Sequence, residues 1–423
     1  MSDLTNSLEY AKRLDAQDPL ALFRGKFHLP QHNGKDSVYF TGNSLGLQPR
    51  SAKDIIETEL NDWAKYGVEG HFHAKHPWYS YHEMFAEPLS KIVGAKPIEV
   101  VAMNGLTVNL HLLMVSFYRP TQNRYKIICE AKAFPSDQYA LESQVRFHGR
   151  DPNDAIIEIA PREGQHTIET DDILLAIEEH GNELAMVMIG GVNYYSGQLM
   201  DMEKITAAGQ AKGAKVGFDL AHAAGNVKLD LHDWGVDFAA WCSYKYMNSG
   251  PGSVAGAFVH ERHKYDPDLP RFAGWWGYNK ETRFKMEPGF DPILGAEGWQ
   301  LSNAPVFSMA IHKASLDIFD DAGISNLIEK SKKLTAFLEF IIEDISSKKE
   351  NVSFEIITPK DPYQRGCQLS ILCHGQGRSL FDHLTENGVF ADWREPNVIR
   401  IAPVPLYNSF EDVYRFGEIL NNG

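Results

Sequence analysis

The sequence predicts an α/β fold with a mostly parallel sheet in a large domain, followed by a smaller α+β domain. From about residue 98 to residue 260, short apolar runs alternate with helix-like segments, a pattern typical of crossover units in a parallel sheet. After about residue 305 this alternation ends and longer helices prevail. With 423 residues, 43% of them hydrophobic, the chain is long enough for two domains with separate cores.

The N-terminal part, up to about Tyr66, is expected to be mostly helix and loop. Residues 51–67 predict a helix in which Ser51 and Asp54 form a capping box. Apolar side chains share one face of this helix: Ile55, Ile56, Leu60 and Trp63.

Six strand-like runs are expected in the large domain: YKIIC (125–129), AIIEIA (155–160), LAMVMIG (184–190), KVGF (215–218), DFAAWC (237–242) and GAFVH (256–260). Helix-like segments at 106–118 and 202–213 lie between them. Ligands of such sheets bind beyond the carboxyl ends of the strands, so we expect a site there.

The smaller domain is expected to contain a long amphipathic stretch at 324–348 and to end with a helix at 409–421, in which Ser409 and Asp412 suggest a capping box. Between these helices the sequence predicts strands at 353–358, 367–373 and 397–403 and a helix at 379–387. The expected division is an N-terminal segment that packs with the small domain (1–60), a large cofactor-binding domain (61–304) and a small α+β domain (305–423).

Composition excludes two classes of partner. The formal net charge of −15 argues against a general binder of nucleic acid or of an anionic membrane, because both need a basic face. No uncharged apolar stretch approaches the length of a membrane span, and the polar N-terminus lacks the apolar core of a secretory leader. Four cysteines without a C-x-x-C motif are expected to be buried free thiols of a cytoplasmic protein: Cys129, Cys242, Cys367 and Cys373.

A carboxylate and a lysine follow two consecutive strand-like runs. Asp219 comes after VGF (216–218), and Lys245 comes shortly after FAAWC (238–242). Such a pair meets two needs of pyridoxal 5'-phosphate (PLP), since the lysine amine bonds the aldehyde carbon and the carboxylate keeps the pyridine nitrogen protonated. The pair therefore predicts a PLP site and carbanion chemistry.

Residues before this pair could complete a PLP site. Gly105 and Thr107 lie where a helix begins, and the free backbone N–H groups of a first turn can bind phosphate. The alternative is that this helix is capped in the ordinary way and binds no phosphate. Phe134 could stack on the pyridine ring and Asp137 could support it, unless FPSD (134–137) is only a turn.

His222 and Tyr244, which lie close to Asp219 and Lys245 in the sequence, each have two interpretations. His222 could bond Asp219 or the cofactor, or it could cap a turn. Tyr244 could contact phosphate and transfer a proton, or it could pack at the end of the sheet. The glycines of SGPG (249–252) let the chain pass close to a cofactor.

A histidine-rich segment and a strand arginine are two further candidates for a site. His71, His73 and His76 lack a carboxylate or cysteine at metal-ligand spacing, so we expect a loop of the substrate pocket and no metal. Arg400 lies between apolar residues of a strand, where its partner is either a substrate carboxylate or an internal carboxylate.

Six segments together closely resemble the kynureninase family, a branch of the fold type I, aspartate-aminotransferase-like PLP enzymes: GNSLGLQP (42–49), NGLTVNLHLLM (104–114), FPSDQYAL (134–141), GFDLAHAAGNV (217–227), DWGVDFAAWCSYKY (233–246) and IRIAPVPLYNSF (399–410). The resemblance extends from about residue 38 to residue 420. It implies hydrolysis of L-kynurenine, and of 3-hydroxy-L-kynurenine, in tryptophan catabolism or NAD biosynthesis. The products would be anthranilate, or 3-hydroxyanthranilate, and L-alanine.

The resemblance also implies residue roles. Lys245, Tyr244 and Asp219 would be catalytic, with Lys245 bonding the cofactor and Asp219 pairing with its pyridine nitrogen. Other implied cofactor contacts are Leu106, Thr107, Phe134, Pro135, Ser136, Asp137, His222, Trp275 and Asn303. Implied substrate contacts are Arg400 for the carboxylate, Ser44 and His71 near the aryl group, and Asn303. Because Trp275 and Asn303 match positions that reach a neighbouring subunit's site, a homodimer is implied.

Two alternatives remain at this point. One is another fold type I enzyme, a cysteine desulfurase or a class V aminotransferase. A desulfurase needs a cysteine on a mobile loop, whereas Cys367 and Cys373 lie in strand-like runs. The other is a PLP-binding protein without catalysis, against which the lysine, aspartate and arginine set argues.

Overall fold

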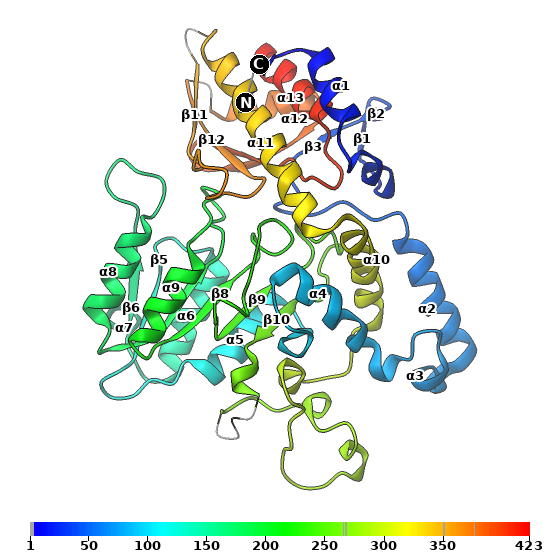
Figure 1. Ribbon diagram of the computed structural model, residues 1–423, viewed down its shortest axis with the longest axis vertical. Coiled ribbons are helices and arrows are strands. Elements are labelled where there is room, and N and C mark those ends of the chain that lie inside the picture. Colours follow the sequence, from blue (N-terminus) through cyan, green and yellow to red (C-terminus); the bar gives the residue numbers. More distant parts are fainter. Residues whose placement is uncertain (1–3, 265, 267–268, 350–351, 376) are drawn as a thin grey trace.

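The structure is a computed structural model that describes residues 4–264, 266, 269–349, 352–375 and 377–423, so the first three residues of the predicted N-terminal segment lie outside it. Figure 1 shows two layered parts, a large sheet with helices on both faces and, above it, a smaller sheet beside which both termini lie. The long helix α11 (Ile324–Ser346) runs from the first part into the second.

The large sheet has seven strands in the order β4-β10-β9-β8-β7-β5-β6. Its strands are β4 (Val100–Ala102), β5 (Lys126–Glu130), β6 (Ile156–Ile159), β7 (Leu184–Gly190), β8 (Lys215–Asp219), β9 (Phe238–Trp241) and β10 (Gly256–Val259). Strands β5 to β9 pair in parallel, whereas β10 is antiparallel to both of its neighbours. All six strand-like runs are confirmed as strands, and the mostly parallel sheet is confirmed with them.

Helices cover both faces of this sheet, and each face has its own core. Val187 and Ile189 of β7 belong to one core, and Met186 and Met188 belong to the other, because alternate residues of a strand point to opposite faces. Burial on both faces explains why these strands read as continuous apolar runs. The helices of this part are α3 (Gly70–His73), α4 (Ala86–Val93), α5 (Leu106–Phe117), α6 (Pro135–Phe147), α7 (Pro152–Ala155), α8 (Thr170–His180), α9 (Met202–Ala211) and α10 (Val306–Ala322).

The smaller sheet is antiparallel, in the order β11-β12-β15-β14. Its strands are β11 (Ser353–Ile356), β12 (Leu369–His374), β14 (Asp392–Arg394) and β15 (Val398–Ile401), and the helices with it are α1 (Leu8–Ala16), α11, α12 (Arg378–Glu386) and α13 (Phe410–Asn422). A third core fills the space between this sheet and its helices. The capping box of Ser409 and Asp412 is confirmed, since the Ser409 hydroxyl accepts the Asp412 N–H at 3.1 Å.

The N-terminal segment joins the smaller part before it returns to the large one. Helix α1 packs on α13, and β3 (Val38–Tyr39) pairs in parallel with β13 (Val389–Phe390). Two other short strands, β1 (Gln31–His32) and β2 (Lys35–Asp36), form a small ribbon. Short 3-10 helices lie at Ala21–Lys26, Gly67–Glu69, Trp78–Phe85, Pro97–Glu99, Glu261–His263, Trp275–Gly277, Arg283–Lys285 and Ala296–Trp299.

Helix α2 (Ala52–Tyr66) forms where expected and packs on α10, but the predicted capping box at Ser51 is wrong. Ser51 has helical backbone angles and its side chain makes no capping hydrogen bond. The turn that begins at Pro49, whose carbonyl accepts the Ala52 N–H at 3.1 Å, already draws Ser51 into a helical conformation. The apolar face of α2 leaves Leu60 and Trp63 exposed.

The prediction that the four cysteines are buried free thiols is confirmed. Among the described helices, none is both long and apolar enough to cross a membrane.

Candidate active site

A cavity of about 280 Å³ lies at the carboxyl edge of the large sheet. Asp219 is the last residue of β8, and Lys245 follows the parallel neighbour β9, so both side chains reach this edge. Of the predicted residues, nine line the cavity: Leu106, Thr107, Phe134, Ser136, Asp137, Asp219, His222, Tyr244 and Lys245. The structure thus brings together segments that span some 140 residues of sequence.

Two of these residues form a buried carboxyl pair. The side chains of Asp137 and Asp219 share a hydrogen bond, and Oδ1 of Asp219 also accepts the Ala221 N–H at 2.6 Å. Burial raises the pKa of both carboxyls, and the charge of Asp219 raises the pKa of Asp137 further. Asp137 therefore keeps the shared proton and donates it, while Asp219 carries the negative charge.

The ammonium group of Lys245 lies among aromatic rings. Its Nζ is 5.7 Å from the ring centroid of Phe134 and 6.0 Å from that of Tyr244. Among the described residues, none accepts a hydrogen bond from this Nζ at a distance of 3.5 Å or less. Phe134 is 40% exposed and makes a T-shaped contact with Tyr194, with 5.3 Å between the ring centroids.

The N-terminus of α5 forms another wall. Its cap residue is Gly105, which supplies no side chain to bond the N–H groups of the first turn. Asn104 precedes it with a φ of 49°, a left-handed conformation that turns the chain into the helix. Leu106 and Thr107 line the cavity, so the uncapped N–H groups and the helix dipole favour an anion there.

His222 and Tyr244 complete the cavity wall, and their pKa values are shifted in opposite directions. Burial, and next the positive charge of Lys245, hold the pKa of His222 well below its usual value, so the imidazole is neutral. Its Nδ1 is buried and has no partner among the described residues, whereas one reading of the sequence paired it with Asp219. Burial, and next the neighbouring thiol of Cys242, raise the pKa of Tyr244, so its hydroxyl keeps its proton.

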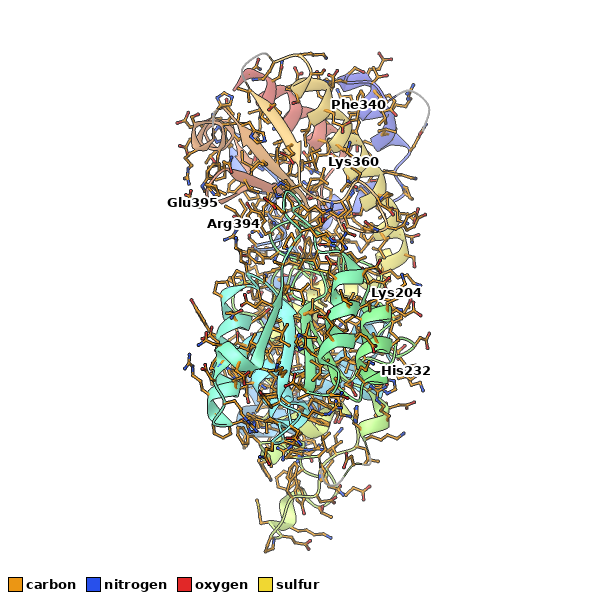
Figure 2. All side chains as sticks on the ribbon, turned by 90° about the vertical axis from the view of Figure 1, so that its left-hand side faces the viewer. Lys204, His232, Phe340, Lys360, Arg394 and Glu395 are labelled. Atoms are coloured by element: carbon orange, nitrogen blue, oxygen red, sulfur yellow. The ribbon has the colours of Figure 1, made fainter. Side chains whose placement is uncertain are left out.

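Arg400 lies beside the cavity and has an internal partner. It is 1% exposed and donates from Nη1 to the carbonyl of Tyr194 at 2.5 Å and from Nη2 to Asp392. Asp392 also accepts the Ser44 hydroxyl at 2.6 Å and the Arg394 guanidinium at 3.2 Å. Figure 2 labels Arg394 at the level where the two parts of the molecule meet. Ser44 and Arg400 are therefore joined through one carboxylate.

Six predicted residues do not line the cavity of their own chain: Ser44, His71, Pro135, Trp275, Asn303 and Arg400. Trp275 is 47% exposed and lies in the segment between β10 and α10, which Figure 1 shows at the foot of the molecule. His71 donates a hydrogen bond from Nδ1 to the Val68 carbonyl at 2.9 Å and makes a T-shaped contact with the Trp78 ring.

Sequence reasoning missed five residues of the cavity wall: Glu130, Gly190, Val192, Tyr194 and Ala221. Glu130 had a usable signal, since it is a charged residue that ends a buried strand. Tyr194 had none, because it reaches the site through the turn after β7.

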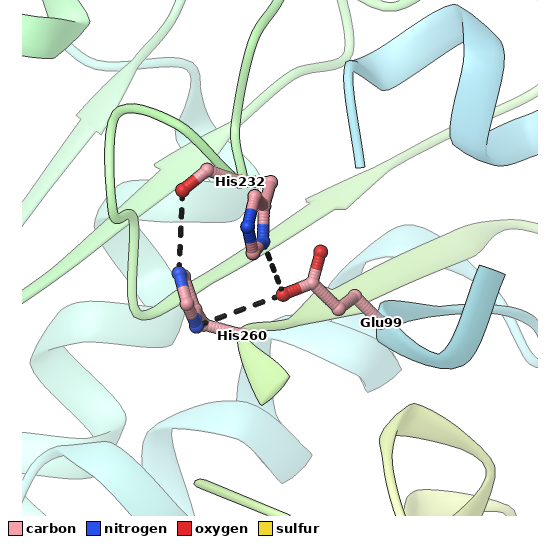
Figure 3. Close-up of side chains that lie close together, drawn as sticks. All are labelled: Glu99, His232 and His260. Carbon is pink, nitrogen blue, oxygen red and sulfur yellow. Dashed lines mark hydrogen bonds and ion pairs between the residues drawn. The ribbon is translucent and has the colours of Figure 1, made fainter. Parts of the chain in front are cut away.

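Two clusters elsewhere have the residue types of metal ligands. In the first, Oε1 of Glu99 lies 2.9 Å from Nδ1 of His232 and 3.6 Å from Nδ1 of His260 (Figure 3). The same carboxylate accepts the N–H groups of Lys96 and Glu261, each at 2.8 Å. Because these lone pairs are already engaged, the cluster serves as a junction between chain segments.

The second cluster consists of His82, Glu83 and Glu297. The ammonium of Lys280 bonds both of its carboxylates, Glu83 at 2.7 Å and Glu297 at 2.6 Å, and thus stands where a cation would.

The donor set of the cavity fits PLP. Lys245 offers an amine for the aldehyde, and the anionic Asp219 suits a protonated pyridine nitrogen. The partly exposed ring of Phe134 matches a cofactor ring, and the uncapped start of α5 matches a phosphate. Nδ1 of His222, which has no partner among the described residues, matches a polar ring substituent.

Sequence comparisons identify relatives over nearly the full chain. Residues 38–354 match the profile of class-V aminotransferases, and residues 327–420 match that of the kynureninase C-terminal domain. A kynureninase of Flavobacterium psychrophilum is 64% identical over 99% of this chain and 98% of its own length. Kynureninases of Myxococcus xanthus (98% of this chain, 97% of the relative) and Nematostella vectensis (98% and 93%) are 56% and 51% identical.

Solved structures share the fold at low identity. An apo cysteine desulfurase from Thermococcus onnurineus NA1 superposes with a TM-score of 0.74 at 15% identity, covering 91% of this chain and 94% of that one. A C-DES variant with glycine covalently linked to its PLP cofactor gives 0.76 at 15% identity, covering 91% and 96%. These likenesses establish fold type I.

Proposed function

The chain belongs to the kynureninase family, and we propose that it hydrolyses L-kynurenine to anthranilate and L-alanine. The 3-hydroxy derivative would give 3-hydroxyanthranilate and L-alanine. The reaction consumes one water and breaks the bond between Cβ and the aryl carbonyl carbon. PLP is the cofactor, and the enzyme is a hydrolase of carbon–carbon bonds in ketones. The observation that carries the proposal is that Lys245, Asp137 and Asp219 line one cavity. Arg400 lies next to this cavity, where it bonds the carbonyl of Tyr194 in the cavity wall.

Several residues would hold the cofactor. Lys245 would bond its aldehyde carbon, the first turn of α5 at Leu106 and Thr107 would bind its phosphate, and Phe134 would stack on its ring. Asp219 would keep the pyridine nitrogen protonated, with Asp137 holding Asp219 in place through their shared proton. Bound there, PLP supplies an electron sink for negative charge at the substrate α-carbon.

Lys245 and Tyr244 would move the protons. Once substrate has displaced it, the free Lys245 amine can take the proton of the α-carbon. Tyr244 keeps its hydroxyl proton at neutral pH, because burial raises its pKa, and it can therefore act as an acid toward the β-carbon of the departing alanine unit.

Arg400 would bind the substrate carboxylate. Its Nη1 already touches the Tyr194 carbonyl in the cavity wall, while Asp392 occupies Nη2. The substrate carboxylate would take over part of the bonding that Asp392 now supplies. Ser44, bonded to the same Asp392, would then face the aryl end of the substrate, with His71 and Asn303.

We also propose a homodimer with shared sites. Trp275 and Asn303 do not line the cavity of their own chain, which supports the proposal that a partner subunit brings them. An apolar groove of about 940 Å³ lies between the N-terminal segment and α2, near the exposed Leu60 and Trp63, and offers a surface for a second copy.

The domain division proposed for this enzyme is an N-terminal segment (1–60), a large PLP-binding domain (61–304) and a small α+β domain (305–423). Four buried free thiols favour a reducing compartment, in agreement with a cytoplasmic enzyme of tryptophan catabolism or NAD biosynthesis.

The structural likeness to cysteine desulfurases raises one alternative, but a suitable thiol is missing from the described residues. Cys367 and Cys373 lie in or beside β12, and burial raises the pKa of each thiol, that of Cys373 to about 12. A persulfide carrier needs an exposed thiolate on a mobile loop.

A substrate comparison tests the proposal. The PLP-loaded protein is given L-kynurenine, 3-hydroxy-L-kynurenine, L-cysteine, or an amino acid with a keto acid acceptor. We expect fluorescent anthranilate from L-kynurenine and 3-hydroxyanthranilate from its derivative. Sulfide from cysteine, or amino transfer without carbon–carbon cleavage, would replace the proposal with one of the alternatives.

A further inference from the structure

A third carboxyl group, that of Glu130, lines the cofactor cavity beside the Asp137–Asp219 pair. Glu130 is the last residue of β5 and is 5% exposed. None of the roles above uses it, although it interacts electrostatically with the pair: the charge of Glu130 raises the pKa of Asp137, and the charge of Asp219 raises the pKa of Glu130.

Glu130 anchors the end of a neighbouring strand. Both of its carboxylate oxygens accept the N–H of Gly190, at 3.1 and 3.2 Å. Backbone pairing between β5 and β7 ends at Ile128 and Val187, so the side chain of Glu130 continues the connection where the backbone no longer does. Gly190 in turn stands opposite Asp219 in the β7–β8 register.

Glycine at position 190 permits this approach. A Cβ there would lie 2.9 Å from Oε1 of Glu130, closer than real Cβ atoms come to another atom without displacement. Glu130, Gly190 and Asp219 therefore connect the ends of β5, β7 and β8 next to the cavity.

We propose that Glu130 is a positioning residue of the PLP site, which holds β7 at Gly190 and adds a titratable negative charge behind the Asp137–Asp219 pair. This inference rests on the proposed function for its link to the pyridine nitrogen. When Glu130 is ionised, its charge favours a proton on groups of the bound cofactor, since a nearby negative charge stabilises a positive one.

The groups that face Glu130 come from every element around it. Asp219 on β8 and Asp137 on α6 are acidic, Cys129 precedes it on β5, and Lys245 supplies the positive charge of the cavity. Burial, and less strongly the charge of Asp219, raises the pKa of Glu130 to about 7. Its ionisation therefore falls within the working pH range of an enzyme.

Glu130→Gln separates anchoring from charge. The glutamine carbonyl can still accept the Gly190 N–H, whereas the titratable charge is gone. Glu130→Ala removes both functions. Glu158→Gln, at an exposed position of the adjacent strand β6, is the matched control with the same loss of charge.

The first measurement is the melting temperature of the cofactor-free protein from pH 5 to pH 8. A carboxyl with a raised pKa binds more protons in the folded state, so the wild type should lose stability relative to Glu130→Gln as the pH rises, by about 3 °C. The melting temperature of Glu158→Gln should change with pH in the same way as that of the wild type. Parallel curves for Glu130→Gln as well would overturn the inference.

The second measurement is the pH titration of the visible absorbance of the PLP-loaded protein. Without the charge of Glu130, the midpoint should fall by about one pH unit in Glu130→Gln. An unchanged midpoint would reduce Glu130 to a structural anchor and overturn its electrostatic role. If the wild type itself fails to bind PLP, the proposed function fails, while the melting curves still decide whether Glu130 titrates in the folded chain.

Discussion

Asp392 lies directly opposite Arg400 in the antiparallel pairing of β14 and β15, and the two side chains form a partly buried ion pair beside the cofactor cavity. Arg394, Ser44 and Arg400 all donate to the same oxygen of this carboxylate. The arginine that we propose binds the substrate carboxylate is thus held in place by another carboxylate.

Arg400→Ala should raise KM for L-kynurenine by about 100-fold, because truncating a buried charge partner costs on the order of 2–5 kcal/mol. The control is Arg394→Ala, which removes another donor to Asp392 without touching the cavity wall, and its KM should change by less than about threefold. Steady-state kinetics at fixed PLP measures both. Equal effects of the two variants would remove Arg400 as the carboxylate anchor.

The carboxyl pair predicts unequal effects of two similar substitutions. Asp219→Asn loses the negative charge that the pyridine nitrogen needs, so kcat should fall by about 1,000-fold. Asp137→Asn keeps a donor for Asp219, since an amide N–H replaces the carboxyl O–H, and kcat should fall by less than about tenfold. The reverse order would mean that Asp137, and not Asp219, carries the charge.

Shared sites predict complementation between inactive subunits. Lys245→Ala and Trp275→Ala dimers are prepared separately, then unfolded and refolded together. Because half of a random mixture is hybrid and each hybrid has one intact site, activity should return to about a quarter of the wild-type value. Activity no higher than the sum of the separate variants would place Trp275 in the site of its own chain, or in neither.

The lowered pKa of Glu297 predicts that the protein loses stability in acid. Burial alone would raise its pKa, but hydrogen bonds from His82 and Lys280 hold the pKa at about 2. A carboxyl with a lowered folded-state pKa stabilises the fold above its unfolded pKa, and this contribution is lost as the pH falls from about 4.5 toward 2. Glu297→Gln should therefore destabilise the protein by about 2 kcal/mol at pH 7 and by much less at pH 3, as measured by urea denaturation.

Much of the fold could be predicted from local patterns. Each strand of the parallel sheet carries its own apolar run, and Asp219 and Lys245 follow two of these runs directly. The cap at Ser409 was predictable for the same reason, because donor and acceptor are three residues apart. The prediction at Ser51 used the same rule and was wrong, since a turn from Pro49 had already set its backbone.

The remaining relationships depend on contacts between distant segments. Glu130 meets Gly190 across 60 residues, and Arg400 meets the Tyr194 carbonyl across 206. Neither contact leaves a local pattern, because each arises from the order of strands and from the way the smaller sheet rests on the large one. The proposed roles of Trp275 and Asn303 would depend on a second chain, which no pattern within one sequence specifies by itself.

Product stoichiometry tests the central claim most directly. The PLP-loaded protein is incubated with L-kynurenine, and anthranilate and L-alanine are quantified over time, with Lys245→Ala and the exposed Lys228→Ala in parallel. We expect the two products in a 1:1 ratio from the wild type and from Lys228→Ala. Lys245→Ala should lose the visible absorbance of the bound cofactor and essentially all turnover. A wild type that binds PLP but releases no anthranilate, or a fully active Lys245→Ala, would contradict the assignment.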